Sequence, residues 1–148
     1  MNKIESFKVD HTRLLPGLYV SRVDGDITTY DMRLKRPNTE PLLSNGEMHS
    51  FEHMFATLVR NGPLEADIIY FGPMGCQTGF YLLVRNANHE KVVAEVGRVL
   101  SEIVAFNGEV FGTGERECGN YRNLELGAAK SVARQALESI KGLSEYPG

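Results

Sequence analysis

The sequence lacks tryptophan, internal repeats, low-complexity tracts and any excess of basic charge. Lys and Arg number 16 against 19 Asp and Glu, a net charge of −3, so no polyanion-binding surface for nucleic acid is indicated. No stretch approaches the roughly 18 apolar residues of a membrane span, and residues 1–15 lack the apolar run of a signal peptide. We therefore expect a cytoplasmic protein that binds neither nucleic acid nor membranes.

Cysteine is scarce too, with only Cys76 and Cys118 present. These two residues can form one disulfide. In a reducing compartment, however, such thiols are more often buried structural groups, metal ligands or nucleophiles. The composition, 42% hydrophobic and 24% charged over 148 residues, fits one globular domain with a sizeable core. We expect residues 1–148 to form that single domain.

Turn signals and apolar periodicity predict an alternation of strands and helices. Hairpin turns are expected at Asp24-Gly25-Asp26 and at residues 72–77. The expected strands lie within residues 17–36, 67–71, 78–85 and 109–111. The expected helices cover residues 45–61, 88–106 and 123–141, the first of them opened by a Ser44-x-x-Glu47 capping box. Antiparallel hairpins with helices on one face make an α+β two-layer sandwich. Its other sheet face needs a cover, which a small chain often obtains by dimerising.

The first expected helix contains the motif His49-Ser50-Phe51-Glu52-His53, an H-x-x-E-H arrangement. At about 100° per residue the two histidines share one arc, so both imidazoles can reach one ion. A separate arc forms the core stripe of Met48, Phe51, Phe55, Leu58 and Val59. A bare histidine pair is most simply a solvated polar face, but Glu52 beside the second histidine strengthens the interpretation as a metal site.

A third metal ligand has to come from another part of the chain. The candidates are His11, His89, Cys76, Cys118 or a carboxylate. The glycine-rich loop 112–119 is the best source, because long irregular loops in compact domains are often functional. Two histidines and Cys118 would leave a fourth position open, as in catalytic metal sites.

Cys76 lies in the expected turn between two apolar strands. The plainer interpretation is a small buried thiol. Against it, Gly75 and Gly79 allow a ligand to approach the backbone closely, and turns on a rigid scaffold often carry functional groups. Both interpretations stay open on the residues alone.

Five ordered motifs span most of the chain. They are Glu5-Ser6-Phe7 with Asp10-His11, Tyr30-Asp31-Met32-Arg33 with Pro37-Asn38, His49-Ser50-Phe51-Glu52-His53, Pro73-Met74-Gly75-Cys76-Gln77-Thr78-Gly79-Phe80-Tyr81, and Glu117-Cys118-Gly119-Asn120-Tyr121-Arg122. With these motifs the chain resembles the S-ribosylhomocysteine lyase family, which makes the precursor of the quorum-sensing signal autoinducer-2. Two departures are small: the family usually has Thr-Leu in place of Ser50-Phe51, and Tyr70-Phe71-Gly72 differs from the more usual Ile-Ser.

The resemblance implies one divalent metal ion per subunit, held by His49, His53 and Cys118. The resemblance implies Fe(II) as the native ion, with Zn(II) or Co(II) also accepted. It also implies a homodimer whose active sites lie at the subunit interface. That agrees with the cover expected for the open sheet face.

The resemblance further implies which residues act on the substrate. Glu52 and Cys76 would be the acid/base pair, and Arg33 would favour the Cys76 thiolate. Ser6 and His11 would line the substrate pocket. Without the resemblance, Arg33 would be interpreted as a surface charge and His11 as an ordinary hydrogen-bonded histidine.

The implied reaction converts S-ribosylhomocysteine to homocysteine and 4,5-dihydroxy-2,3-pentanedione. Two carbonyl migrations precede β-elimination of the thioether, and no organic cofactor is required. Two roles stay open for the reaction: it supplies a signal precursor, or it serves only to recycle methyl-cycle waste.

Two other functions stay open. A metallopeptidase of the inverted H-x-x-E-H type predicts a carboxylate third ligand such as Glu117 and no role for Cys76. A non-enzymatic, dimeric metal-binding module predicts that both thiols are structural.

Overall fold

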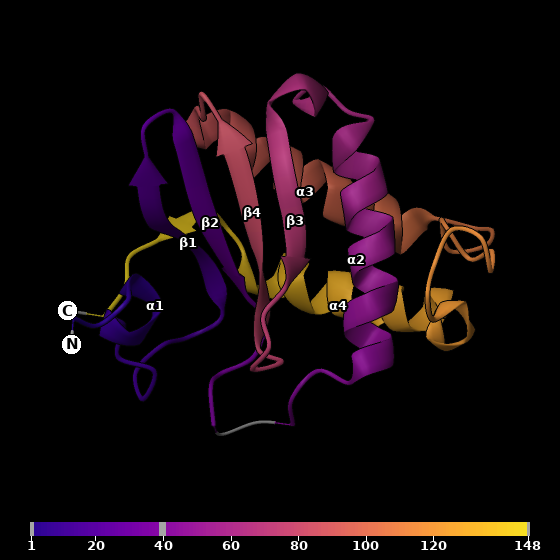
Figure 1. Cartoon of the computed structure of the whole chain (residues 1–148), viewed down its shortest axis with the longest axis horizontal. Coiled ribbons are helices and arrows are strands. Elements are labelled where there is room, and N and C mark those ends of the chain that lie inside the picture. The colour runs from indigo at the N-terminus through magenta and orange to yellow at the C-terminus, as the bar shows by residue number, and fades with distance from the viewer. Residues whose placement is uncertain (1, 39–40, 148) are drawn as a thin grey trace.

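A five-stranded sheet with helices packed against it makes up the computed structural model, which describes residues 2–38 and 41–147 (Figure 1). The sheet order is β3-β4-β2-β1-β5. The strands are β1 (Gly17–Asp24), β2 (Ile27–Arg33), β3 (Ile68–Pro73), β4 (Gly79–Arg85) and β5 (Leu143–Ser144). The helices are α1 (Glu5–Lys8), α2 (Asn45–Arg60), α3 (His89–Ala105) and α4 (Leu126–Ser139), with 3₁₀ turns η1 (Glu65–Asp67) and η2 (Tyr121–Asn123).

Both predicted hairpins are present. β1 pairs antiparallel with β2 around a turn in which Gly25 has a φ of 61°, a left-handed conformation that favours glycine. β3 pairs antiparallel with β4, and β4 pairs antiparallel with β2. The sheet is not wholly antiparallel as expected, because β5 adds to β1 in parallel. Two residues are too few for an alternating strand pattern, so β5 left no recognisable signal in the sequence.

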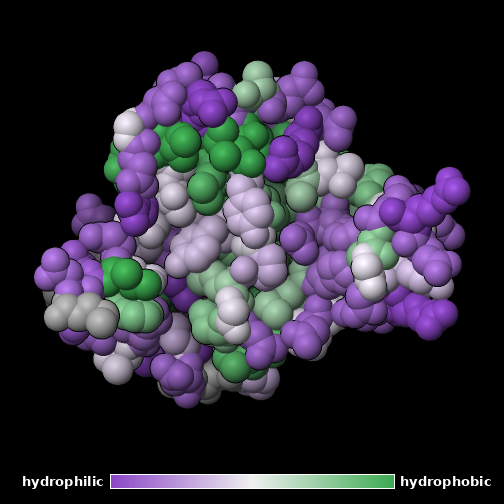
Figure 2. Space-filling view, in the orientation of Figure 1, coloured by the Kyte–Doolittle hydropathy of each residue, from purple (hydrophilic) through white to green (hydrophobic). Residues whose placement is uncertain are grey.

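The helices are arranged unequally about the sheet. In Figure 1, α3 and α4 cross behind the strands and α2 runs beside β3, which it contacts. Of the described helices, only the short α1 lies on the near side, next to β1. Figure 2 shows hydrophobic and near-neutral atoms exposed over this near face, between hydrophilic margins. The mixed α+β class is confirmed, and dimerisation through the open face stays a prediction.

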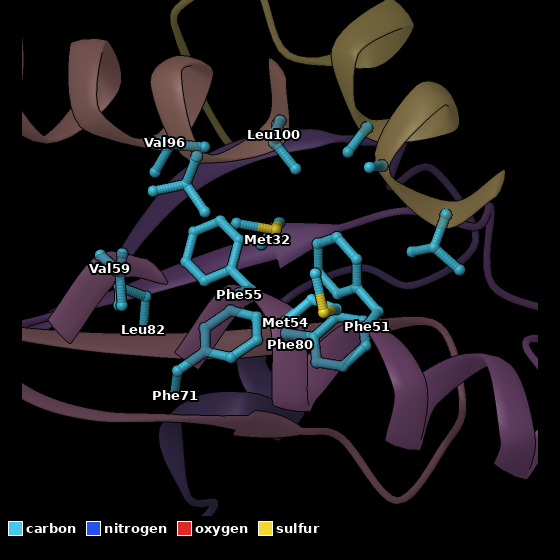
Figure 3. Packing of buried hydrophobic residues seen from close by; sticks show 14 of the residues in the cluster. Met32, Phe51, Met54, Phe55, Val59, Phe71, Phe80, Leu82, Val96 and Leu100 are labelled. Atoms are coloured by element: carbon cyan, nitrogen blue, oxygen red, sulfur yellow. The ribbon is translucent and has the colours of Figure 1, made fainter. Parts of the chain in front are cut away.

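Aromatic packing joins α2 to the sheet (Figure 3). The rings of Phe55 and Phe71 stack with centroids 4.3 Å apart, and those of Phe51 and Phe80 lie 5.0 Å apart. The helix begins with the predicted capping box, in which Ser44 and Glu47 each accept from the other's backbone N–H. The packing of the aromatic rings fixes the rotation of α2 about its axis and therefore the direction of its polar face.

The core stripe predicted on α2 is wider than expected. Met48, Phe51, Phe55 and Val59 are buried as predicted, but Leu58 is only partly buried and Met54 is fully buried. The reason is that α2 packs against α4 as well as β3, so a second side of the helix is covered.

One expected strand is absent, and the bounds of other elements differ from those expected: β2, for example, ends at Arg33 rather than at residue 36. Residues 109–111 form no strand: Val110 is buried in the core, and the carbonyl of Phe111 bonds a side chain of α2 rather than a neighbouring strand. The last helix begins at Leu126 rather than residue 123, because residues 121–123 form the tighter turn η2. In the part of the chain that the structure describes, no helix has the length and apolar character needed to cross a membrane. The cytoplasmic location and the single domain stay predictions.

Candidate active site

Three side chains from two regions meet at the polar face of α2. His49 and His53 lie one turn apart, and Cys118 comes from the loop between α3 and η2. Their potential ligand atoms lie within 4.8 Å of one another, and the Cys118 Sγ is 3.2 Å from the His49 Nε2. All three are partly buried. The predicted ligands thus form a group that can bind a metal ion.

Hydrogen bonds prepare both imidazoles to bind a metal. The His53 Nδ1 lies 2.8 Å from the Phe111 carbonyl oxygen, and the His49 Nδ1 lies 2.5 Å from the Asn123 Oδ1. Since these oxygens only accept, each Nδ1 carries the proton and each Nε2 keeps its lone pair for a metal. The backbone N–H of Asn120 donates to the Cys118 Sγ over 3.4 Å, which helps to fix the position of the sulfur. The donor set therefore fits a divalent metal.

The supporting groups of this site were not predicted. Asn123 was expected to open a helix, and residues 109–111 were expected to form a strand. Gly112 follows Phe111 with a φ of 69°, and a Cβ there would lie 3.1 Å from the His53 Nδ1. A glycine at position 112 is therefore the one feature of the sequence that could have indicated a close approach of the backbone to His53.

Replacing Asn123 by alanine is expected to weaken metal binding about 10- to 100-fold, because the partner that fixes the His49 tautomer is lost. Competition with a chromophoric chelator measures the affinity. Asn120→Ala is the matched control, since the hydrogen bond of Asn120 to Cys118 comes from its backbone N–H, which the substitution keeps. Equal affinities of the two variants would contradict the role of Asn123.

The Glu52 side chain lies next to that of the metal ligand His53. Together with Gly112, the two residues line a cavity of about 550 Å³. Glu117 also lines this cavity, but its carboxylate accepts the Gly114 backbone N–H and is not part of the ligand group. The inverted-motif peptidase, which requires a carboxylate third ligand, is therefore not favoured.

Cys76 lies elsewhere, in the turn between β3 and β4. It is exposed, and both cysteines are free thiols, so its interpretation as a buried hydrophobe is wrong. It lines a cavity of about 410 Å³ together with Ser6, His11 and Arg33, the three residues expected at the substrate pocket. The His11 Nδ1 is 2.8 Å from the Val9 carbonyl oxygen, which leaves Nε2 for another partner.

Arg33 is not a surface charge, because only 3% of it is exposed. It forms an ion pair with Asp31 over 2.7 Å, and its Nη1 donates to the Thr78 Oγ1 over 2.8 Å. The same nitrogen lies 4.0 Å from the Cys76 Sγ. Burial lowers the pKa of Arg33, but the Asp31 carboxylate outweighs burial and holds that pKa above its ordinary value. A permanent cation therefore lies beside the thiol.

The expected site residues thus fall into two groups within one chain. The metal half consists of the three metal ligands and Glu52, and the thiol half consists of Cys76, Ser6, His11 and Arg33. The cavity lined by Glu52 and His53 of the metal half and the cavity lined by the thiol half have no residue in common.

Comparison with known proteins decides the family. A protein-family model described as S-ribosylhomocysteinase (LuxS) matches residues 4–146. The chain belongs to the S-ribosylhomocysteinase family. Relatives named S-ribosylhomocysteine lyase include that of Finegoldia magna, 44% identical over 98% of this chain and 96% of its own. The relative from Borreliella afzelii is 43% identical over the same shares, and that from Clostridium beijerinckii is 44% identical over 95% of this chain and 92% of its own. Membership of the S-ribosylhomocysteinase family disfavours the non-enzymatic alternative.

Proposed function

We propose that the protein cleaves S-ribosylhomocysteine to homocysteine and 4,5-dihydroxy-2,3-pentanedione, the autoinducer-2 precursor. The observation that carries the proposal is the group of His49, His53 and Cys118, whose Nδ1 atoms are both engaged in hydrogen bonds, with Glu52 lining the same cavity as His53. The family model that matches residues 4–146 and the relatives named S-ribosylhomocysteine lyase support it. No organic cofactor is needed for the chemistry.

A divalent metal ion bound by these ligands would act as a Lewis acid toward the carbonyl and hydroxyl oxygens of the substrate. Mixed imidazole and thiolate ligands suit several such ions. Fe(II) is proposed as the native ion, with Zn(II) or Co(II) as substitutes. Within the chain, Asn123 and the Phe111 carbonyl would hold the imidazoles in the orientation that this ion requires.

Two side chains are proposed to move protons. The thioether at C5 cannot leave until a carbonyl lies β to it, so the carbonyl has to move from C1 to C2 and then to C3. Each shift takes the C–H proton from the hydroxyl-bearing carbon next to the carbonyl and returns a proton to the former carbonyl carbon. The hydroxyl proton moves to the former carbonyl oxygen, so the carbonyl is displaced by one carbon. Glu52 and Cys76 are suited to these transfers as carboxylate and thiolate. A last proton is taken from C4, the C5–S bond breaks, and its electron pair leaves with the homocysteine sulfur, which takes up a proton. The enol that remains at C4 and C5 tautomerises to the pentanedione.

The thiol half is built to keep Cys76 reactive. Arg33 supplies a positive charge 4.0 Å from the sulfur, which favours the thiolate over the thiol. The Thr78 Oγ1, 3.0 Å from the same sulfur, orients it. Ser6 and His11, which line the same cavity, are proposed to hydrogen-bond the substrate.

A homodimer would bring the two halves together. Since Glu52 and His53 of the metal half line a different cavity from the thiol half, we place each active site between subunits, with the metal half of one facing the thiol half of its partner. The open sheet face provides a surface for this association: Thr29, Tyr81 and Leu83 line a hollow of about 350 Å³ on it. Tyr81 also lines the Cys76 cavity, so burying this face would enclose the thiol half.

The activity is tested by incubating the Fe(II)-loaded protein with S-ribosylhomocysteine and following homocysteine by mass spectrometry. Homocysteine and the pentanedione are expected in equal amounts. The metal-free protein serves as the control and is expected to be inactive. An Fe(II)-loaded protein that releases no homocysteine would overturn the proposal.

A further inference from the structure

The C-terminal segment returns to the thiol half of the site from far along the chain. Its strand β5 pairs in parallel with β1, with Ser144 opposite Tyr19, and Figure 1 shows this yellow segment beside β1. Two residues later, the ring of Tyr146 stacks on the ring of Tyr19, with centroids 4.6 Å apart and planes 1° apart. The stack fixes where the Tyr146 hydroxyl can point.

That hydroxyl reaches the ion pair beside Cys76. The Tyr146 O–H donates to the Asp31 Oδ2 over 2.7 Å, and the same oxygen accepts from the Arg33 Nη2 over 2.7 Å. The other carboxylate oxygen accepts from the Arg33 Nε over 3.2 Å. Burial, followed by the charge of Asp31, raises the pKa of Tyr146 far above its ordinary value, so its proton stays available for donation.

We propose that Tyr146 is a positioning residue for Cys76, acting through Asp31 and Arg33. Asp31 and Arg33 alternate with the core-facing residues of β2, so both point to the open face of the sheet. By sharing its oxygen with Tyr146, Asp31 is held in one rotamer, and it in turn fixes the guanidinium whose Nη1 bonds Thr78 and lies near the Cys76 sulfur. The role in turnover rests on the proposed function of Cys76.

The direction of the effect follows from the titratable groups around Cys76. Arg33 of β2, with its ion-pair partner Asp31, Tyr81 of β4 and His11 after α1 surround the Cys76 cavity or contact a residue that lines it. The Tyr146 hydroxyl partly neutralises Asp31. Without it, Asp31 offsets more of the Arg33 field at the sulfur, and Arg33 is less firmly oriented. Both changes disfavour the thiolate.

Tyr146→Phe tests this, because it keeps the stacked ring and removes only the hydroxyl, which donates to Asp31 and also hydrogen-bonds the Ser21 side chain. Alkylation of Cys76 by iodoacetamide is followed by peptide mass spectrometry across a pH series on the metal-loaded, full-length protein. At neutral pH we expect alkylation to slow about three- to tenfold and the profile to move to higher pH. The kcat for homocysteine release is expected to fall by a similar factor, with KM changed less than twofold.

Tyr19→Phe is the matched control. It also removes one hydroxyl from the stacked pair, but that hydroxyl donates to the Leu15 carbonyl rather than to Asp31. Its Cys76 profile is expected to match the wild type, with thermal unfolding measured for both variants. An unchanged profile in Tyr146→Phe, or equal slowing in both variants, would overturn the inference. Alkylation requires no substrate, so the alkylation measurement decides the positioning role even if the wild-type protein releases no homocysteine. The absence of homocysteine release would refute the proposed function and not the positioning role.

Discussion

Cys76→Ala is expected to lower kcat/KM for homocysteine release about 10²- to 10⁴-fold, the range found when a proton-transferring group is removed. Metal content is expected to stay at the wild-type level. The physical reason is the division of the site: Cys76 is exposed in the β3–β4 turn, and the ligand atoms of His49, His53 and Cys118 form their own group. Steady-state kinetics and elemental analysis of the same preparation measure both quantities.

The second cysteine provides the control. Cys118→Ala removes a metal ligand and is expected to lose metal and turnover together. The contrast between the two cysteines also distinguishes the lyase from the two other functions that the sequence left open. A peptidase would tolerate the loss of Cys76, and a non-enzymatic module would have no turnover to lose. Full activity of Cys76→Ala, or loss of its metal, would contradict the assignment of Cys76 as an acid/base group.

The local features of the fold could be predicted because their causes lie close together in the sequence. The Ser44–Glu47 capping box and the Asp24-Gly25-Asp26 turn each depend on a few consecutive residues, and both are present. His49 and His53 share a helix face because residues four apart on a helix are neighbours. Cys118 was only one of several candidate ligands until the family motifs were considered.

The groups that support the site could not be predicted because they depend on how distant segments cross. Asn123 reaches His49 from 74 residues away, and Tyr146 reaches Asp31 from 115 residues away. No spacing rule connects such pairs. Arg33 looked like a surface charge for the same reason, since its burial depends on Asp31 and Thr78 and on the strands around them. The apolar residue Val110 suggested a strand, but it packs into the core without joining the sheet.

A heterodimer of Cys76→Ala and Glu52→Gln subunits is expected to recover about half of the wild-type activity per dimer, although each homodimer is inactive. In the proposed dimer, one of its two sites combines an intact Glu52 from the first subunit with an intact Cys76 from the second. The other site carries both substitutions. Co-expression with two different affinity tags and tandem purification isolates this heterodimer for kinetic measurement.

The decisive comparison places both substitutions on one subunit. A wild-type subunit paired with a Cys76→Ala, Glu52→Gln subunit has one substitution in each interfacial site, so this heterodimer is expected to be inactive. If each chain instead formed a complete site by itself, the two results would exchange: the doubly substituted heterodimer would keep about half of the activity, and the complementing one would have none. The two heterodimers contain the same substitutions in the same number, so any difference between them comes from which chain supplies each half of the site. The separation of the Glu52 and Cys76 cavities within one chain favours the interfacial outcome.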